Sequence, residues 1–169
     1  MFNRKGIRHK DFDYNNIGYY FITFRIENND YLLSKVFENN VELTEYGRVV
    51  KYYIEDLNNE LVKVDSYIIM PNHVHLILFI HEDVGEIHEF PLQNKGHSSS
   101  RRNMIIPKII GRLKMQSSKK INIIRNSINS KFWQRNYYDR IIRNEKELDE
   151  IRKYIYYNPL NWSNDAYFI

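Results

Sequence analysis

Two histidines stand two residues apart inside one of the most apolar runs of the chain, "YIIMPNHVHLILFI" (residues 67–80). Side chains alternate along a β-strand, so His73 and His75 are expected on one face and Val74 on the other. Two imidazoles in this arrangement can hold one metal ion at adjacent coordination positions. An isolated His-x-His is common, so the alternative from the residues alone is a pair of hydrogen-bonded histidines on a sheet face.

A second pair of candidate functional residues lies near the end of the chain. The stretch "NEKELDEIRKYIYYNP" (144–159) predicts a helix, with Asn144 as N-cap, acids in the first turns and Pro159 as its stop. Tyr154 and Asn158 are four residues apart and share one stripe of this helix. The Asn158 amide oxygen could be a third metal ligand, with Tyr154 beside the metal; the alternative is a packed tyrosine and a helix cap.

Only Tyr154, among the five tyrosines of this region, shares a stripe with Asn158. At 3.6 residues per turn, Tyr156 lies about 200° around the helix from Tyr154, and Tyr157 lies about 300° around. The pair at 137–138 precedes the helix and is expected in or near an edge strand. The spacing therefore favours Tyr154 as the tyrosine that faces a metal together with Asn158.

The elements that must position these residues follow the order strand–helix–strand–strand–helix–strand–helix. The expected strands are 18–27, 62–70, 73–80 and a short, bent edge strand within 131–143, and the expected helices are 42–59, 107–125 and 144–159. Thr44 is the expected N-cap of the first helix, Pro107 belongs to the first turn of the second, and the turn at 71–72 joins an antiparallel pair. This order matches an α+β fold, a ferredoxin-like plait with an antiparallel central sheet and an added C-terminal helix that carries Tyr154.

Length and composition predict one domain, residues 1–169, in a cytoplasmic protein. The segment 81–103 is acidic and then rich in Ser and Gly, and we expect an exposed loop there. No apolar run reaches the length of a membrane helix, and the N-terminus lacks the apolar core of a signal peptide. Because the chain has no cysteine, disulfides and thiolate metal sites are excluded.

Positive charge is concentrated in one region of the chain. Residues 95–143 hold thirteen Lys and Arg against one acid, whereas residues 1–94 hold nine against fifteen acids. Such a field is typical of a protein that binds a phosphate backbone, and association with the nucleoid would follow. The alternative is a solvated basic helix. The residues expected to contact DNA phosphates are Lys108, Arg112, Lys114, Lys119 and Lys120.

Taken together, these stretches resemble a known family. "MPNHVHLIL" resembles the His-hydrophobe-His (HUH) motif of single-strand DNA endonucleases, and "FWQRNYYDRIIRNEKELDEIRKYIYYNPLNW" resembles the C-terminal signature of the REP-associated tyrosine transposases. "GYYFITFRIEN" is similar to the first strand of that group. The resemblance covers residues 18–162, and the two motifs together are far more specific than either alone.

The resemblance implies a metal-dependent endonuclease and strand transferase that acts on single-stranded, hairpin-forming DNA through a 5′-phosphotyrosine intermediate. It maps His73, His75 and Asn158 onto the metal ligands and Tyr154 onto the nucleophile, with Mg²⁺ or Mn²⁺ as the ion. Many relatives carry glutamine where Asn158 stands, although the REP-associated branch also shows Asn-Pro. The resemblance to the REP-associated branch, which looks monomeric with its complete site in one chain, implies a monomer here. A homodimer is the alternative.

Two other functions compete with the transposase hypothesis. A plait sheet with aromatic residues and a basic helix can bind single strands without cutting them, as an inactive or domesticated copy would. A metal hydrolase that needs no tyrosine is the third reading. The intact histidines, tyrosine and asparagine favour the catalytic hypothesis.

Overall fold

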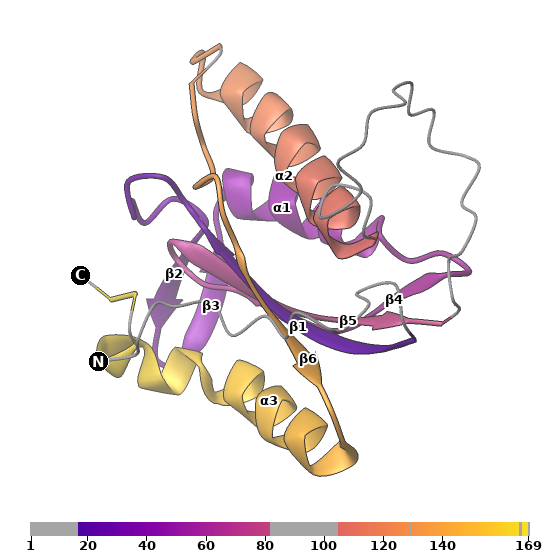
Figure 1. Cartoon of the computed structure of the whole chain (residues 1–169). Coiled ribbons are helices and arrows are strands. Elements are labelled where there is room, and N and C mark those ends of the chain that lie inside the picture. The colour runs from indigo at the N-terminus through magenta and orange to yellow at the C-terminus, as the bar shows by residue number, and fades with distance from the viewer. Residues whose placement is uncertain (1–16, 82–104, 129, 166, 169) are drawn as a thin grey trace, which may run out of the picture.

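The computed structural model describes residues 17–81, 105–128, 130–165 and 167–168. In chain order its elements are β1 (Gly18–Arg25), β2 (Ser34–Phe37), β3 (Asn40–Leu43), α1 (Glu45–Glu55), β4 (Val62–Ile69), β5 (His73–Ile80), α2 (Ile105–Ile124), β6 (Tyr138–Ile142), α3 (Glu145–Tyr157) and the 3₁₀ helix η2 (Pro159–Asn164) (Figure 1). Among these residues, no helix combines the length and the apolar character that crossing a membrane requires.

Four strands form the central sheet in the order β4-β5-β1-β6, and all neighbours are antiparallel. This is the strand order of a βαββαβ plait, so the predicted fold class is confirmed. Helices α1 and α2 cover one face of the sheet, and α3 lies against the other (Figure 1). The sheet therefore has two covered faces, and β5, which carries the histidines, is an inner strand.

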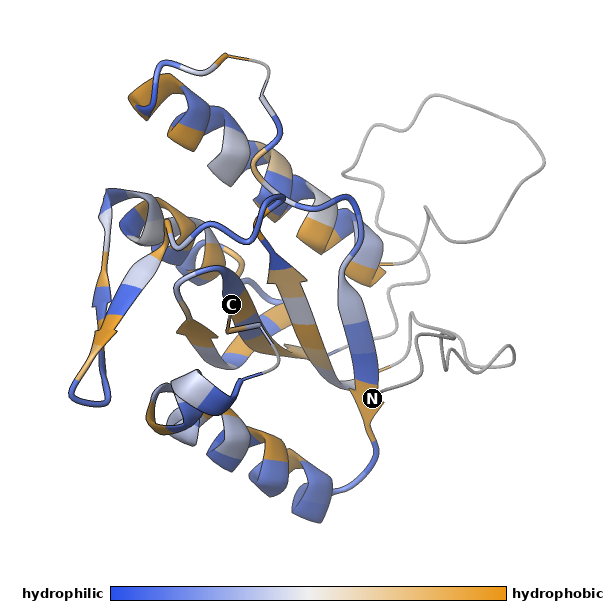
Figure 2. Cartoon of the chain, turned by 90° about the vertical axis from the view of Figure 1, so that its left-hand side faces the viewer, coloured by the Kyte–Doolittle hydropathy of each residue, from blue (hydrophilic) through white to orange (hydrophobic). Residues whose placement is uncertain are grey.

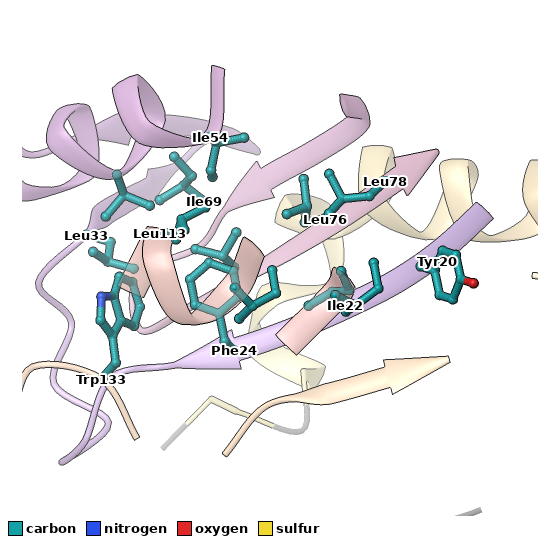
Figure 3. Close-up of a cluster of buried hydrophobic side chains, with 14 of the residues drawn as sticks. Tyr20, Ile22, Phe24, Leu33, Ile54, Ile69, Leu76, Leu78, Leu113 and Trp133 are labelled. Atoms are coloured by element: carbon teal, nitrogen blue, oxygen red, sulfur yellow. The ribbon is translucent and has the colours of Figure 1, made fainter. Parts of the chain in front are cut away.

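The main core lies between the sheet and the α1–α2 layer. Tyr20, Ile22 and Phe24 alternate along β1 and are all buried, as the period of a strand requires (Figure 3). Leu76 and Leu78 of β5 face the same core. Coloured by hydropathy, the helices turn apolar stripes toward the sheet and polar residues outward (Figure 2). The opposite face of β5 is thereby left for His73 and His75.

A smaller core holds α3 against the sheet. Its buried members are Ile77, Ile142, Leu148, Ile151 and Ile155, of which the last three form the buried face of α3. The β4 strand has a register break between Val64 and Ser66. Asp65, at this break, accepts two hydrogen bonds from Arg152 of α3, one of them of 2.9 Å from Nε. The bulge thus directs a carboxylate at α3 and fixes the helix against the sheet.

Both predicted N-caps are present. Thr44 Oγ1 accepts from the Gly47 amide at 3.1 Å, and Asn144 Oδ1 accepts from the Glu147 amide at 2.9 Å. Glu147 in turn accepts from the Arg143 amide, so the start of α3 is closed from both sides. These caps set where α3 begins and hence which residues occupy its inner stripe.

Three features differ from the expectations. The hairpin β2–β3 was not predicted, because its two-residue turn is made by Glu38 and Asn39 with positive φ and contains no glycine. Since residues 42–43 belong to β3, the first helix begins at Glu45. Helix α2 begins at Ile105, two residues before the expected start at Pro107.

The segment after α3 and the edge strand can also be compared with the expectations. Helix α3 ends before Pro159, as expected, and the chain continues as the 3₁₀ helix η2, which the sequence did not predict. The edge strand is shorter than its segment and bent as expected: β6 covers 138–142, and an isolated bridge joins Ile26 to Trp133. Except for His81, the expected exposed loop lies outside the described residues.

Candidate metal and tyrosine site

The two histidines converge on one point beneath the sheet. His73 is fully buried, His75 is 2% exposed, and their Nε2 atoms lie 3.1 Å apart. Val74 between them faces the main core, which fixes the strand against rotation. Two nitrogens bound to one ion at about 2.1 Å and at right angles would be about 3.0 Å apart. The observed separation therefore fits two adjacent ligands of a single ion.

Neighbouring polar groups hold the other ring nitrogen of each histidine. Asn72 Nδ2 donates to the backbone carbonyl of Tyr167 at 2.7 Å, which leaves its Oδ1 to accept from His73 Nδ1 at 2.8 Å. With its proton on Nδ1, His73 presents a lone pair at Nε2. His75 Nδ1 lies 2.7 Å from Thr23 Oγ1, which gives this ring the same kind of support. Such outer partners orient metal-binding imidazoles.

Burial keeps both imidazoles neutral. Desolvation lowers the pKa of His73 to about 2, and the repulsion that a protonated His73 would meet from a protonated His75 and from Arg25 lowers this pKa further. Desolvation alone lowers the pKa of His75 to about 3. Protons therefore do not compete with a metal ion for the two Nε2 atoms at neutral pH.

The helix α3 brings Tyr154 onto the histidines. Its hydroxyl lies 3.1 Å from His75 Nε2, and its ring packs edge-on against Phe21 of β1, with centroids 6.1 Å apart. Tyr154 is 45% exposed, so the residue is partly accessible to solvent. Desolvation and the Asp165 carboxylate raise the pKa of Tyr154 to about 12, so the phenol is protonated at neutral pH.

The other tyrosines considered from the sequence are placed elsewhere. Tyr156 and Tyr157 pack against each other at 5.0 Å between centroids, and Tyr156 is 74% exposed. Tyr138 begins β6, opposite Thr23 in the register, and contacts Phe21. Of Tyr138, Tyr154, Tyr156 and Tyr157, it is Tyr154 whose hydroxyl lies within hydrogen-bond distance of a site histidine.

Asn158 is buried at the C-terminal end of α3, one turn after Tyr154. Its Nδ2 donates to Asp165 Oδ2 at 3.3 Å, whereas its Oδ1 has no hydrogen-bond partner among the described residues. A buried amide oxygen without a partner is costly. A cation bound at the histidines would give this oxygen a partner.

Asp165 is a site residue that sequence reasoning missed. One ligand atom from each of His73, His75 and Asp165 lies within 4.8 Å of the others, a grouping that fits a metal ion. Asp165 reaches the site because η2 reverses the chain after Pro159, a turn that no spacing rule signals. Its only sequence signal is that it is the one charged residue among 159–169. The mixture of imidazole, amide and carboxylate donors suits a divalent ion.

The basic residues of α2 do not gather at this site. Lys108, Arg112, Lys119 and Lys120 belong to the helix layer on the opposite face of the sheet (Figure 1). Lys114 has a different environment: its ammonium donates to the carbonyls of Gln134, Arg135 and Asn136, and burial lowers its pKa to about 8. The structure thus gives Lys114 a role in holding the segment before β6.

Arg25 is the cation at the site, and the sequence analysis did not single it out. It pairs with His73 in the β1–β5 register, and its guanidinium lies 5.3 Å from the centre of the Tyr167 ring. Its Nε donates to Gln134 Oε1 at 2.7 Å, which holds the side chain in place. A fixed guanidinium beside a metal site is suited to binding a phosphate.

A ferredoxin-like plait that places a helical tyrosine beside a buried His-x-His pair fits the predicted resemblance to single-tyrosine transposases. The family described as "Transposase IS200 like" matches residues 97–158, which include α2, β6 and α3. An uncharacterized protein of Haemophilus influenzae is 33% identical over 99% of this chain and 94% of its own length. The chain belongs to the family of IS200-like transposases.

The fold also resembles a solved structure of this class. A REP-associated tyrosine transposase, determined bound to a REP hairpin, superposes with a TM-score of 0.55 at 17% identity, over 94% of this chain and 74% of that chain. This superposition supports the fold, and the added C-terminal helix is present as expected. The match to the IS200-like family model confirms the predicted family resemblance.

Proposed function

We propose that this transposase is a metal-dependent endonuclease and strand transferase that cuts single-stranded, hairpin-forming DNA through a 5′-phosphotyrosine intermediate. The single observation that carries the proposal is the 3.1 Å approach of the Tyr154 hydroxyl to His75 Nε2, inside a group of metal-binding side chains. A nucleophile and a metal site in contact are what a phosphoryl transfer requires.

The ligand set consists of His73 and His75 with oxygen atoms from Asn158 and Asp165. When bound, Mg²⁺ or Mn²⁺ would neutralise charge on a nonbridging phosphate oxygen and so favour attack by an oxygen nucleophile. Asn72 and Thr23 hold the imidazoles in the orientation that aims both Nε2 atoms at the ion. Arg25 would bind the phosphate from the side of His73.

Tyr154 would attack the scissile phosphorus with its phenolic oxygen. A phosphorus–oxygen bond to Tyr154 forms as the bond to the 3′ oxygen breaks; the phenol loses a proton, and the departing 3′ oxygen gains one. Because the phosphotyrosine retains a phosphodiester, attack by another 3′-hydroxyl reverses the step and joins a new strand without ATP. The raised pKa of Tyr154 means that the phenol must lose its proton during the reaction.

The DNA would extend from α2 to the site around the β6 edge of the sheet. Strand β6 is this edge, and the exposed Lys131, Arg135 and Arg140 precede it or lie on it. A hairpin that contacts Lys108, Arg112, Lys119 and Lys120 on one face would send its single-stranded flank past these residues toward Tyr154. Phosphate contacts along this path would supply most of the affinity and no sequence information.

A monomer that acts on its own is part of the proposal. Tyr154 meets the histidines of its own chain, and α3 is tied to the same sheet by the Asp65–Arg152 pair. No residue of a second copy is needed to bring tyrosine and histidines together. A homodimer that exchanges the tyrosine helix is the alternative.

The proposal is tested by cleavage of an end-labelled hairpin taken from inverted repeats that flank the gene. Wild-type protein should cut in Mg²⁺ or Mn²⁺ and not in EDTA, and His73→Ala or His75→Ala should abolish cutting while hairpin binding survives. Equal cutting in EDTA would remove the metal from the mechanism. Tight binding without any cutting by the wild type would favour the non-catalytic binding module.

A further inference from the structure

Three aromatic side chains, one from the N-terminal half of the chain and two from its C-terminal segment, form a surface beside His73 that the reaction described above does not use. Tyr31 follows β1, Trp162 belongs to η2, and Phe168 lies near the end of the chain. The Trp162 ring contacts both of the others, at 5.5 Å from Tyr31 and 5.3 Å from Phe168 between centroids. We call these three residues the aromatic platform.

The platform touches the candidate metal site directly. The Trp162 ring lies 5.9 Å from the His73 ring, and Tyr167, which precedes Phe168, lies 4.6 Å from the same ring. Tyr154 approaches from the other histidine. The nucleophile thus contacts His75, and the platform contacts His73 through Trp162.

The outer two rings of the platform are exposed although large aromatic side chains gain from burial. Tyr31 is 43% exposed and Phe168 is 45% exposed, whereas Trp162, which supports both, is 9% exposed. The rings of Tyr31 and Phe168 lie within 29° of parallel. Exposed aromatic faces held by a buried third ring are suited to stacking on a flat, uncharged π-system.

We propose that the aromatic platform binds the unpaired base of a nucleotide next to the scissile phosphate, and so sets where the strand is cut. The proposal rests on the proposed single-strand activity, because only an unpaired base can present its face to the rings. Arg25, which lies over the Tyr167 ring, would bind the scissile phosphate that adjoins this nucleotide. Stacking tolerates any base, so the platform would select an unpaired position and not a sequence.

The platform is tested by fluorescence with 2-aminopurine, which is quenched when it stacks on an aromatic ring. Hairpin oligonucleotides carry the probe at one unpaired flanking position at a time, and binding is measured in EDTA so that no strand is cut. At one flanking position, wild-type protein should quench the 2-aminopurine fluorescence. The Tyr31→Leu and Phe168→Leu variants should not quench it. Each substitution should weaken binding by about 10-fold, whereas Tyr31→Phe should bind as the wild type does.

Two controls separate this inference from its alternatives. Tyr52→Leu removes a tyrosine that is 64% exposed on α1, in the opposite layer, and should change neither quenching nor affinity. An abasic nucleotide at the quenched position should weaken wild-type binding, and the leucine variants should then show no further loss. Equal losses on intact and abasic oligonucleotides, or the absence of a position whose quenching depends on Tyr31 and Phe168, would overturn the platform. Because quenching reads binding and not cutting, a wild type that quenches but never cuts would refute the proposed function alone.

Discussion

The hydroxyl of Tyr154 and Nε2 of His75 lie 3.1 Å apart, although 79 residues separate the two in the chain. This contact depends on two independent pieces of local structure. The strand β5 turns His75 away from the main core, and the capped, Asp65-anchored α3 turns Tyr154 toward the sheet. The site is therefore a product of the fold, and changes far from the reacting atoms should alter it.

The first prediction concerns the residue that orients His75. Thr23→Val keeps the shape of a buried side chain and removes the hydroxyl at His75 Nδ1. Affinity for Mn²⁺, measured by calorimetry, should fall by about 10- to 100-fold, with little change in the circular dichroism spectrum. Ser118→Ala, on α2, is the control and should bind Mn²⁺ normally. Unchanged affinity in Thr23→Val would mean that the threonine does not orient a ligand.

The second prediction concerns stability against pH in EDTA. Folding lowers the pKa values of His73 and His75 to about 2 and about 3, so below the unfolded-state value of 6.5 the unfolded chain binds protons that the folded chain does not. Stability is therefore fully present above pH 6.5 and is lost as the pH falls. From pH 7 to pH 5 the free energy of unfolding in urea should drop by up to about 2 kcal/mol for each imidazole.

The comparison for this second prediction is the pH dependence of a double variant. His73→Leu with His75→Leu removes both buried bases, so its stability should change less between pH 7 and pH 5, whatever its absolute value. Equal slopes for the two proteins would show that other groups account for the loss.

The third prediction concerns DNA binding by α2. Replacing Lys108, Arg112, Lys119 and Lys120 with glutamine should weaken hairpin binding and reduce the log–log salt slope by about one for each residue that contacts a phosphate. Lys114→Met should instead lower the thermal midpoint and leave the slope intact, because its ammonium binds three backbone carbonyls. Unchanged affinity and slope in the fourfold variant would place the DNA elsewhere.

The fourth prediction concerns assembly of the site within one chain. A His73→Ala, His75→Ala variant mixed with Tyr154→Phe should not cut, because each chain lacks half of its own site. A dimer that exchanged α3 would combine the intact tyrosine of one chain with the intact histidines of the other. Recovery of cutting in the mixture, in proportion to dimer formation, would contradict the monomer.

The sequence predicted the parts of the site that depend on local periodicity. The alternation of β5 placed His73 and His75 together, and the helical repeat placed Tyr154 and Asn158 on one stripe. Asp165 and Arg25 could not be found in this way. Asp165 arrives through the reversal at η2, and Arg25 adjoins His73 through the pairing of two strands about fifty residues apart in sequence.

Charge density was a weaker guide than periodicity. Clustering of Lys and Arg along the chain does not specify which face of the sheet will carry them, and α2 packs on the face away from the histidines. Lys114 also shows that a cation in a basic run can be occupied by the protein itself. Both outcomes depend on tertiary packing, which linear counts of charge do not contain.

The central claim is that Tyr154 forms the covalent bond to DNA. It is tested most directly by incubating wild-type protein and Tyr154→Phe with a 5′-extended, end-labelled hairpin and Mn²⁺, followed by a denaturing gel and mass mapping of the adduct. We expect a wild-type adduct on the peptide that contains Tyr154, and none in Tyr154→Phe, which should still fold and bind the hairpin. An adduct in Tyr154→Phe, or one mapped to Tyr138, Tyr156 or Tyr157, would contradict the account.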